Sequence, residues 1–327
     1  MDRAMREPLL AYVKNGGVMP DGGDEARKRL MREIGVRNLF VRTRLFALTS
    51  ALAQAGVPAV ALKGAHLMQV AYPFGVRPLE DIDLLVDRAH YERTDAVLRA
   101  AGYEARVEGM DVWTHLTFSN KITYMNRKEH PVIPIDVHFS LGPYPYLGTL
   151  RPELLESRTE TIETEHGRLR VLGPEALLLH LCLHLFQHHF DDWEVSCCDI
   201  VTVLRLDRDR IDWRSFDELV RDNRLSLPVA YAFGKAKELA AEVYIPGSLL
   251  PGGRPTAARE RWVYARSLKQ RSPFDRYVLQ FVTTPGWRNK LLGAAKIAAP
   301  SRTQLRMHHR NSYVRYLWDI IKTAVKR

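Results

Sequence analysis

The sequence has few cysteines and no long apolar run. The three cysteines among 327 residues are Cys182, Cys197 and Cys198, and none belongs to a CxxC pair. This excludes a disulfide-stapled framework and a cysteine-based zinc finger, and it predicts a reducing, cytoplasmic location. No stretch of about 18 apolar residues is present, so we expect no membrane span. The N-terminal residues lack the apolar run of a secretory signal.

Several catalytic motifs are also missing. The chain has no GxSxG nucleophile elbow, no GxxxxGK[ST] phosphate loop and no HExxH zinc motif. Serine hydrolases of that kind, P-loop enzymes and HExxH metalloproteases are therefore excluded. With 46% hydrophobic and 26% charged residues, the composition is that of a globular protein, and the length predicts about two domains.

Acidic residues are scarce in one part of the chain only. From Arg254 to the end there are 17 basic and 3 acidic residues, whereas the first 253 residues carry 31 basic and 35 acidic ones. We interpret this basic, aromatic-rich segment either as a helix packed with its arginines in solvent or as a surface for an anionic partner. That partner would be an acceptor, a nucleic acid or a membrane.

Hydrophobic spacing predicts an α+β fold. We expect a catalytic domain over residues 1–150 (a mixed sheet with flanking helices), a helical substrate-binding domain over 151–250, and a basic helical extension over 251–327. The strands are expected at 57–62, 80–86, 103–107, 114–119 and 132–139. The helices are expected at 24–56, 63–72, 88–101, 174–190, 195–206, 212–223 and 228–243.

Two strands carry acidic side chains in apolar surroundings. Asp81 and Asp83 are two residues apart, so on a strand they share one face. Such carboxylates repel each other unless a cation lies between them, and Mg²⁺ prefers hard oxygen ligands. Asp136 lies in the apolar strand 132–139. Three carboxylates on two strands can hold two Mg²⁺ ions, although a solvated strand end also explains an isolated Asp-x-Asp.

The order of these motifs resembles the bacterial uncharacterised nucleotidyltransferases of the DNA polymerase β-type superfamily. The similarity covers roughly residues 35–245. The matching segments are Leu62-Lys63-Gly64, Arg77-Pro78, the run Asp81-Ile82-Asp83-Leu84-Leu85-Val86, Gly102-Tyr103 and Asp136-Val137-His138.

This resemblance implies an activity: transfer of a nucleoside monophosphate from an NTP to a hydroxyl acceptor, with release of pyrophosphate. Asp81 and Asp83 would bind both metal ions, and Asp136 would bind the catalytic ion and help to activate the hydroxyl. Mg²⁺ is the expected cofactor, with Mn²⁺ as the alternative. The acceptor is expected to be a small molecule, a peptide or a protein.

The resemblance also implies a nucleotide-binding set. Gly64 would admit the triphosphate at a helix N-terminus, while Lys63 and Arg77 would contact phosphates. His138 would touch the nucleotide or acceptor, or else support a carboxylate. Ala65 stands where the superfamily has serine, and the 17 residues from the glycine to the first aspartate form a longer gap than usual. The Gly-Ala departure and the basic C-terminal segment favour, as an alternative, a nucleotide- or nucleic-acid-binding protein without turnover.

A helix in the second half carries histidines at four-residue spacing. His180, His184 and His188 would lie along one face, and we interpret them as buried residues with local hydrogen bonds. The alternatives are a substrate-facing role and a zinc site. The resemblance also singles out Asp199 as substrate-facing, whereas a helix cap or a buried salt bridge explains this residue equally well. A zinc site would make the protein a helical metal-dependent phosphohydrolase.

Overall fold

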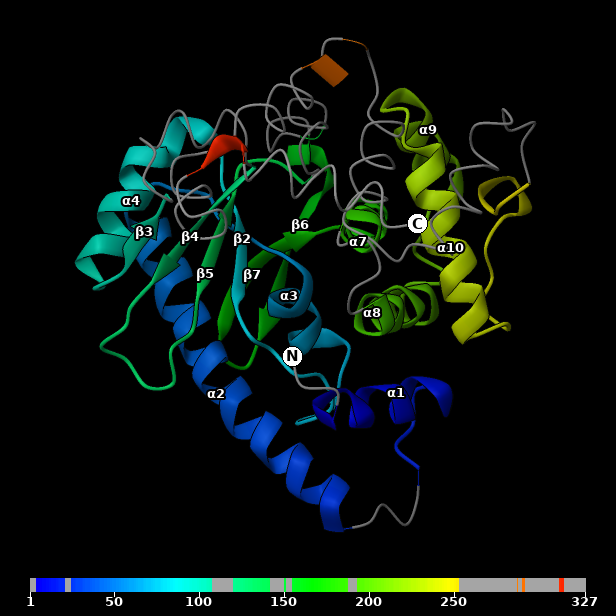
Figure 1. Ribbon diagram of the computed structural model, residues 1–327, viewed down its shortest axis with the longest axis horizontal. Coiled ribbons are helices and arrows are strands. Elements are labelled where there is room, and N and C mark those ends of the chain that lie inside the picture. Colours follow the sequence, from blue (N-terminus) through cyan, green and yellow to red (C-terminus); the bar gives the residue numbers. More distant parts are fainter. Residues whose placement is uncertain are drawn as a thin grey trace.

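A mixed sheet of seven strands lies at the centre of the molecule (Figure 1). The computed structural model describes residues 4–20, 25–107, 120–141, 150, 155–187 and 193–252, and positions 287, 290, 291 and 312–314. The strand order is β3-β4-β5-β2-β1-β7-β6. The strands are β1 (Val60–Ala61), β2 (Ile82–Leu85), β3 (Glu104–Arg106), β4 (Lys121–Met125), β5 (Ile135–His138), β6 (Thr159–Thr164) and β7 (Gly167–Leu172).

Both strand directions occur in this sheet. The pairs β2–β5 and β1–β7 are parallel, whereas β1–β2, β3–β4, β4–β5 and β6–β7 are antiparallel. A parallel pair needs a crossover connection. Helix α4 (Tyr91–Ala100) lies in the connection between β2 and β5, and α3 (Lys63–Val70) follows β1. The expected α+β class is confirmed.

Helices cover the two faces of the sheet separately. The helix expected at 24–56 is α2 (Glu25–Gln54), which lies with α4 over one face (Figure 1). Apolar residues of α2 such as Leu45 and Leu52 pack there with Ile82, Leu84 and Val137 of the sheet. The second core is built around α7 (Pro174–Gln187), α8 (Trp193–Leu206), α9 (Trp213–Asp222), α10 (Ser226–Leu239) and α1 (Glu7–Lys14).

The second core also includes residues of the sheet. Val60, Leu85 and Leu172 belong to the same buried cluster as the helical half. The helices begin at identifiable signals: Asp212 caps α9 by accepting hydrogen bonds from the backbone N–H groups of Arg214 and Ser215. Pro174 occupies the first position of α7, where its missing N–H has no cost.

The sequence analysis missed three strands, β4, β6 and β7. Two of them, β6 and β7, lie after residue 150, so the sheet extends to Leu172. A domain division at residue 150 would therefore cut the hairpin β6–β7 from the sheet that β7 joins through β1. The expected strand 114–119 and nearly all of the basic extension lie outside the described residues. In the described part of the chain, no helix is long and apolar enough to cross a membrane.

Candidate metal and nucleotide site

The register of three neighbouring strands brings polar side chains together on one face of the sheet. In the parallel pair β2–β5, Asp83 lies opposite Asp136. In the antiparallel pair β4–β5, Thr123 lies opposite Asp136 and Lys121 lies opposite His138. Side chains alternate between faces along a strand, and the neighbours Ile82 and Leu84 accordingly point into the core beneath α2.

Three of these side chains form a group that can hold a metal ion. Asp83, Asp136 and His138 are buried, and one ligand atom from each lies within 4.8 Å of the others. Carboxylate oxygens suit Mg²⁺ and Mn²⁺, and an imidazole nitrogen is a ligand for transition metals. The donor set therefore fits a divalent cation. His138, expected either to touch the nucleotide or acceptor or to support a carboxylate, belongs to this group.

Asp81 lies just before β2, next to the group. Burial and, after it, the negative charge of Asp83 raise the pKa of Asp81 to about 7, although the positive charge of Lys63 acts in the opposite direction. A raised pKa is the expected signature of carboxylates that share a site without a cation between them. The paired aspartates predicted from the sequence thus do repel each other in the folded chain.

Lysines pair with two buried carboxylates of the site, Asp83 and Asp136. The Nζ atom of Lys63 donates to Oδ1 of Asp83 at 2.7 Å, and Nε2 of His138 donates to the same oxygen at 2.7 Å. Burial alone would raise the pKa of Asp83, but the charge of Lys63 and the His138 hydrogen bond hold it well below its usual value. Lys121 pairs with Oδ2 of Asp136, and Thr123 donates to Oδ1 of Asp136 at 2.6 Å.

Lys121 and Thr123 were missed by the sequence analysis. Both lie on β4, whose residues alternate between half-buried and buried over Lys121–Met125. The alternation of Ile122 and Tyr124 with polar residues was the signal that could have revealed this strand. Its pairing with β5, 13 to 15 residues further along the chain, is what brings the two side chains to Asp136.

The turn at Lys63 and Gly64 begins helix α3. Lys63 has a φ of +42°, which is uncommon for a residue with a Cβ atom, and its side chain reaches Asp83. A Cβ atom on Gly64 would lie 2.3 Å from Cδ2 of Leu79 and 2.4 Å from Nη1 of Arg77. The space opposite Gly64 is therefore filled by the chain's own side chains, including one of the two predicted phosphate-binding residues.

Arg77 connects the sheet half to the helical half. Its Nε donates to Oδ1 of Asp199 at 2.8 Å and its Nη2 donates to Oδ2 at 2.7 Å. Tyr72 also donates to Asp199, and Asn38 of α2 donates to the carbonyl of Arg77 at 2.8 Å. Both Arg77 and Asp199 are buried. Asp199, predicted to face the substrate, thus contacts a predicted phosphate-binding residue.

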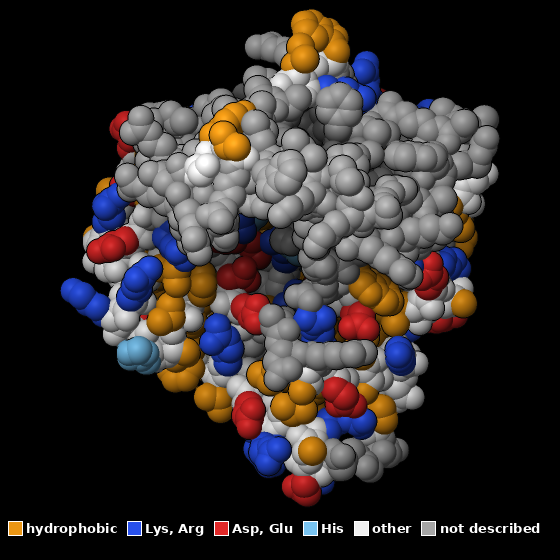
Figure 2. All heavy atoms as spheres, viewed as in Figure 1, with side chains coloured by type: hydrophobic (Ala, Val, Ile, Leu, Met, Phe, Trp, Pro, Cys, Tyr) orange, Lys and Arg blue, Asp and Glu red, His pale blue; other side chains and the backbone are white. Residues whose placement is uncertain are grey.

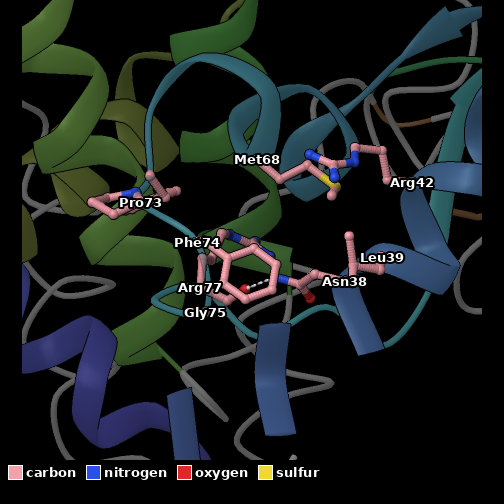
Figure 3. A pocket seen from close by; sticks show the side chains of 9 residues that line it. Asn38, Leu39, Arg42, Met68, Pro73, Phe74, Gly75 and Arg77 are labelled. Carbon is pink, nitrogen blue, oxygen red and sulfur yellow. Dashed lines mark hydrogen bonds between the residues drawn. The ribbon is translucent and has the colours of Figure 1, made fainter. Parts of the chain in front are cut away.

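Arg77 also lines a pocket of about 100 Å³ (Figure 3). The aromatic ring of Phe74 stands at its edge, and the dashed line marks the hydrogen bond from Asn38 to Arg77. The carboxylates are absent from its lining, which consists of Asn38, Leu39, Arg42, Met68, Tyr72, Pro73, Phe74, Gly75 and Arg77. Figure 2 shows a separate hollow near the centre of the face it draws, with acidic and basic side chains around it.

Two histidines of α7, His180 and His184, form a row of rings that begins at His138 of the carboxylate site. The ring of His180 packs edge-on against that of His138 with centroids 6.3 Å apart, and the His184 ring lies 6.4 Å from that of His180. Burial and the nearby charge of Lys63 lower the pKa of His180 to about 3, so this imidazole is neutral. His188 lies outside the described residues. Within the described residues, the metal-capable group does not include His180 or His184.

The cysteines do not contribute a nucleophile. All three are buried, and burial raises the pKa of each thiol. A thiolate is the reactive form of cysteine, so these residues act as apolar core residues of α7 and α8.

A comparison with known protein families agrees with the motifs. The model of a family described as uncharacterised nucleotidyltransferase matches residues 12–241. The fold is also similar to the crystal structure of an antigenic nucleotidyltransferase-like protein from Paracoccidioides brasiliensis. That match has 15% sequence identity and a TM-score of 0.37, and it covers 62% of this chain and 96% of the other. No curated protein matches the sequence significantly. The family model matches more than half of the length of this chain, and the chain therefore belongs to the uncharacterised nucleotidyltransferase family.

Proposed function

We propose that the protein transfers a nucleoside monophosphate from an NTP to a hydroxyl acceptor and releases pyrophosphate, with Mg²⁺ or Mn²⁺ as cofactor. The observation that carries this proposal is the group formed by Asp83, Asp136 and His138, whose ligand atoms lie within 4.8 Å of one another. Asp81 is not part of this group, but its carboxylate is close enough to interact electrostatically with Asp83 and Asp136. Family membership supports nucleotidyl transfer in general.

Each residue has a separate task in this proposal. Asp81, Asp83 and Asp136 bind the cations, which when bound neutralise the triphosphate and stabilise the leaving pyrophosphate. Asp136 takes the proton of the acceptor hydroxyl, and Thr123 fixes the orientation of its carboxylate through Oδ1. His138 orients Asp83 through the 2.7 Å hydrogen bond between them. Positioning of this kind supplies much of the catalysis in phosphoryl transfer.

The phosphate-binding side of the site is proposed at the start of α3. Lys63 lies beside Asp83, and the guanidinium of Arg77 lies against Gly64. Both cations are thus near the helix N-terminus, where backbone N–H groups favour an anion. The donors of Arg77 already bind Asp199 and the carbonyl of Pro78, so Arg77 acts on phosphate through its charge or after exchanging partners.

The acceptor is proposed to approach from the helical half. His138 of the sheet packs against His180 of α7, which supports an acceptor site formed between α7 and the sheet, with His184 facing it. His188 was also expected to face the substrate, and it lies outside the described residues. A small molecule, a peptide or a protein fits this proposal. The basic C-terminal segment would contact an anionic partner, and the sparse cysteine content supports a cytoplasmic protein.

Incubation with each labelled NTP and Mg²⁺ or Mn²⁺, first alone and then with cell extract, tests this proposal. Label should move to a small molecule, a peptide or the protein itself. Asp83→Asn and Asp136→Asn should each reduce transfer by about 100-fold or more, because each removes an anionic metal ligand. Asp222→Asn, at an exposed position of α9, is the matched control. Transfer that persists in both site variants would contradict the assignment.

A nucleotide-binding protein without turnover is the second candidate. It is favoured by the lysines that already hold Asp83 and Asp136 and by the side chains packed against Gly64. In that case, the NTP should bind in equilibrium dialysis while no label moves to any acceptor. The phosphohydrolase alternative would instead require stoichiometric zinc in the purified protein, measured by atomic absorption.

A further inference from the structure

We propose that Lys121 is a triphosphate-binding residue that the metal-free protein keeps on Asp136. This inference rests on the proposed nucleotidyl transfer and adds a residue to it. Lys121 lies on β4, the strand next to β5, and pairs with Oδ2 of Asp136. In this proposal, the ammonium group of Lys121 binds Asp136 when no cation is present. When a cation binds Asp136, the ammonium group binds the triphosphate instead.

A divalent cation and Lys121 compete for the same carboxylate. The other oxygen of Asp136, Oδ1, accepts the 2.6 Å hydrogen bond of Thr123. A cation that binds Oδ2 would therefore come next to the ammonium group of Lys121. Two positive charges in contact repel each other strongly where bulk water does not screen them. Binding of the cation therefore displaces this ammonium group from Asp136.

The position of Lys121 lets its ammonium group move to a bound triphosphate. Its side chain is 37% exposed, whereas that of Asp136 is 6% exposed, so Lys121 reaches the site from the solvent side. Lysine is a compact charge on a flexible four-carbon stem. Lys63, in contrast, is 10% exposed at its side chain and is held at the start of α3. Of the two lysines, Lys121 has the room to exchange partners.

In the proposed reaction, the anion available to the displaced ammonium group of Lys121 is the triphosphate of the NTP. The face formed by β2, β5 and β4 carries Asp81, Asp83 and Asp136, and in the proposed reaction each of these carboxylates binds a cation. The NTP donor brings about four negative charges, and the metal ions that bind it also offset the charges of the three aspartates, so negative charge remains on the phosphate oxygens. A lysine at the rim of the carboxylate group is suited to bind the remaining phosphate oxygens as a point charge.

The test measures binding without turnover on the full-length protein. Lys121→Met removes the ammonium group and keeps an unbranched side chain. We expect it to bind Mn²⁺ about tenfold more tightly, because the competitor is gone, and to bind inorganic tripolyphosphate in saturating Mn²⁺ about tenfold more weakly. Lys121→Arg should retain tripolyphosphate binding. Titration by electron paramagnetic resonance and calorimetry gives both affinities.

Lys128→Met is the matched control, because Lys128 is exposed in the turn of the same β4–β5 hairpin. Neither affinity should change in it. If Lys121→Met is folded by circular dichroism and binds Mn²⁺ no more tightly than the parent, or binds tripolyphosphate equally well, the inference is wrong. If the methionine variant does not fold, Lys121→Gln is measured with the same criteria.

Two further variants separate this inference from the proposed function. Asp83→Asn and Asp136→Asn should each weaken Mn²⁺ binding. If the parent protein binds no Mn²⁺, or these variants bind it unchanged, the metal site is wrong and both proposals fail. If the aspartate variants lose Mn²⁺ while Lys121→Met behaves as the parent, only the role of Lys121 fails.

Discussion

Buried ionisable side chains in this molecule are paired with a partner or shifted to their neutral form. Asp83 and Asp136 are each held by a lysine, because an isolated carboxylate is costly to remove from water. His66, on α3, is instead shifted to its neutral form. It is buried, its Nδ1 has no hydrogen-bond partner within the described part of the chain, and burial and then the charge of Arg210 lower its pKa to about 4.

His66 should make the protein less stable as the pH falls. The unfolded chain binds a proton at this imidazole below about pH 6.5, whereas the folded chain does so only near its lowered pKa. The free energy of unfolding should therefore decrease as the pH falls from about 6.5 to about 4, on the order of 3 kcal/mol at most. Urea unfolding across this range measures the effect.

His66→Gln isolates this contribution from other groups, among them Asp81, whose raised pKa acts in the opposite sense. The variant should lose stability less steeply on acidification than the parent. His166→Gln, at a partly exposed histidine of the β6–β7 turn, is the control. Equal slopes for the parent and the His66 variant would show that His66 does not set this dependence.

At the scale of elements, the start of α3 is packed against the segment that leads into β2. Gly64 faces Leu79 and Arg77 at distances that leave no room for a methyl group. Leu79 is buried, and Arg77 is fixed by two hydrogen bonds to Asp199. The glycine therefore permits a close approach of helix and loop, and that approach places Lys63 beside Asp83.

Gly64→Ala should destabilise the protein by about 1 to 3 kcal/mol, because the added methyl group overpacks a buried contact. Gly247→Ala is the control, since a Cβ atom there meets nothing within 4 Å, and its free energy of unfolding should change by less than about 0.5 kcal/mol. Urea unfolding of both variants measures the difference. A Gly64 variant as stable as the parent would show that Leu79 and Arg77 move aside freely.

At the scale of the whole molecule, the two halves of the chain share a core and a buried ion pair. Val60 and Leu85 of the sheet belong to the same cluster as α7, α8 and α10. Arg77, before β2, binds Asp199 of α8, 122 residues further along the chain. The strand that carries Asp83 is thus attached directly to the helical half, so the two halves are expected to unfold together.

Asp199→Ala should lower the free energy of unfolding by about 3 to 5 kcal/mol, because it leaves the buried guanidinium of Arg77 without its anion. The unfolding transitions of sheet and helices should remain coincident, as measured by tryptophan fluorescence and circular dichroism. Glu218→Ala, which removes an exposed pair with Arg214 on α9, should change stability by less than about 1 kcal/mol. A similar, small effect at Asp199 would contradict the structural role assigned to this pair.

Much of the sheet and of its acidic face was readable from local patterns. The alternation around Asp83 placed Ile82 and Leu84 in the core and the carboxylate on the other face, because strand geometry has a period of two residues. The end of α2 near Gly56 and the start of α9 at Asp212 were likewise readable, since both signals act on neighbouring backbone groups. The alternation in β4 is equally local, although this strand was not among those predicted.

What the sequence by itself determined is the chemistry that is available: aspartates on two apolar strands, a Lys-Gly turn, and no cysteine or serine nucleophile motif. What only the tertiary structure decided is which partner each charge has. The pairs Lys121–Asp136 and Arg77–Asp199 join residues 15 and 122 positions apart, and no local pattern encodes such distances. Strand register and helix packing set them, because burying a charge requires a partner that only the folded chain brings close.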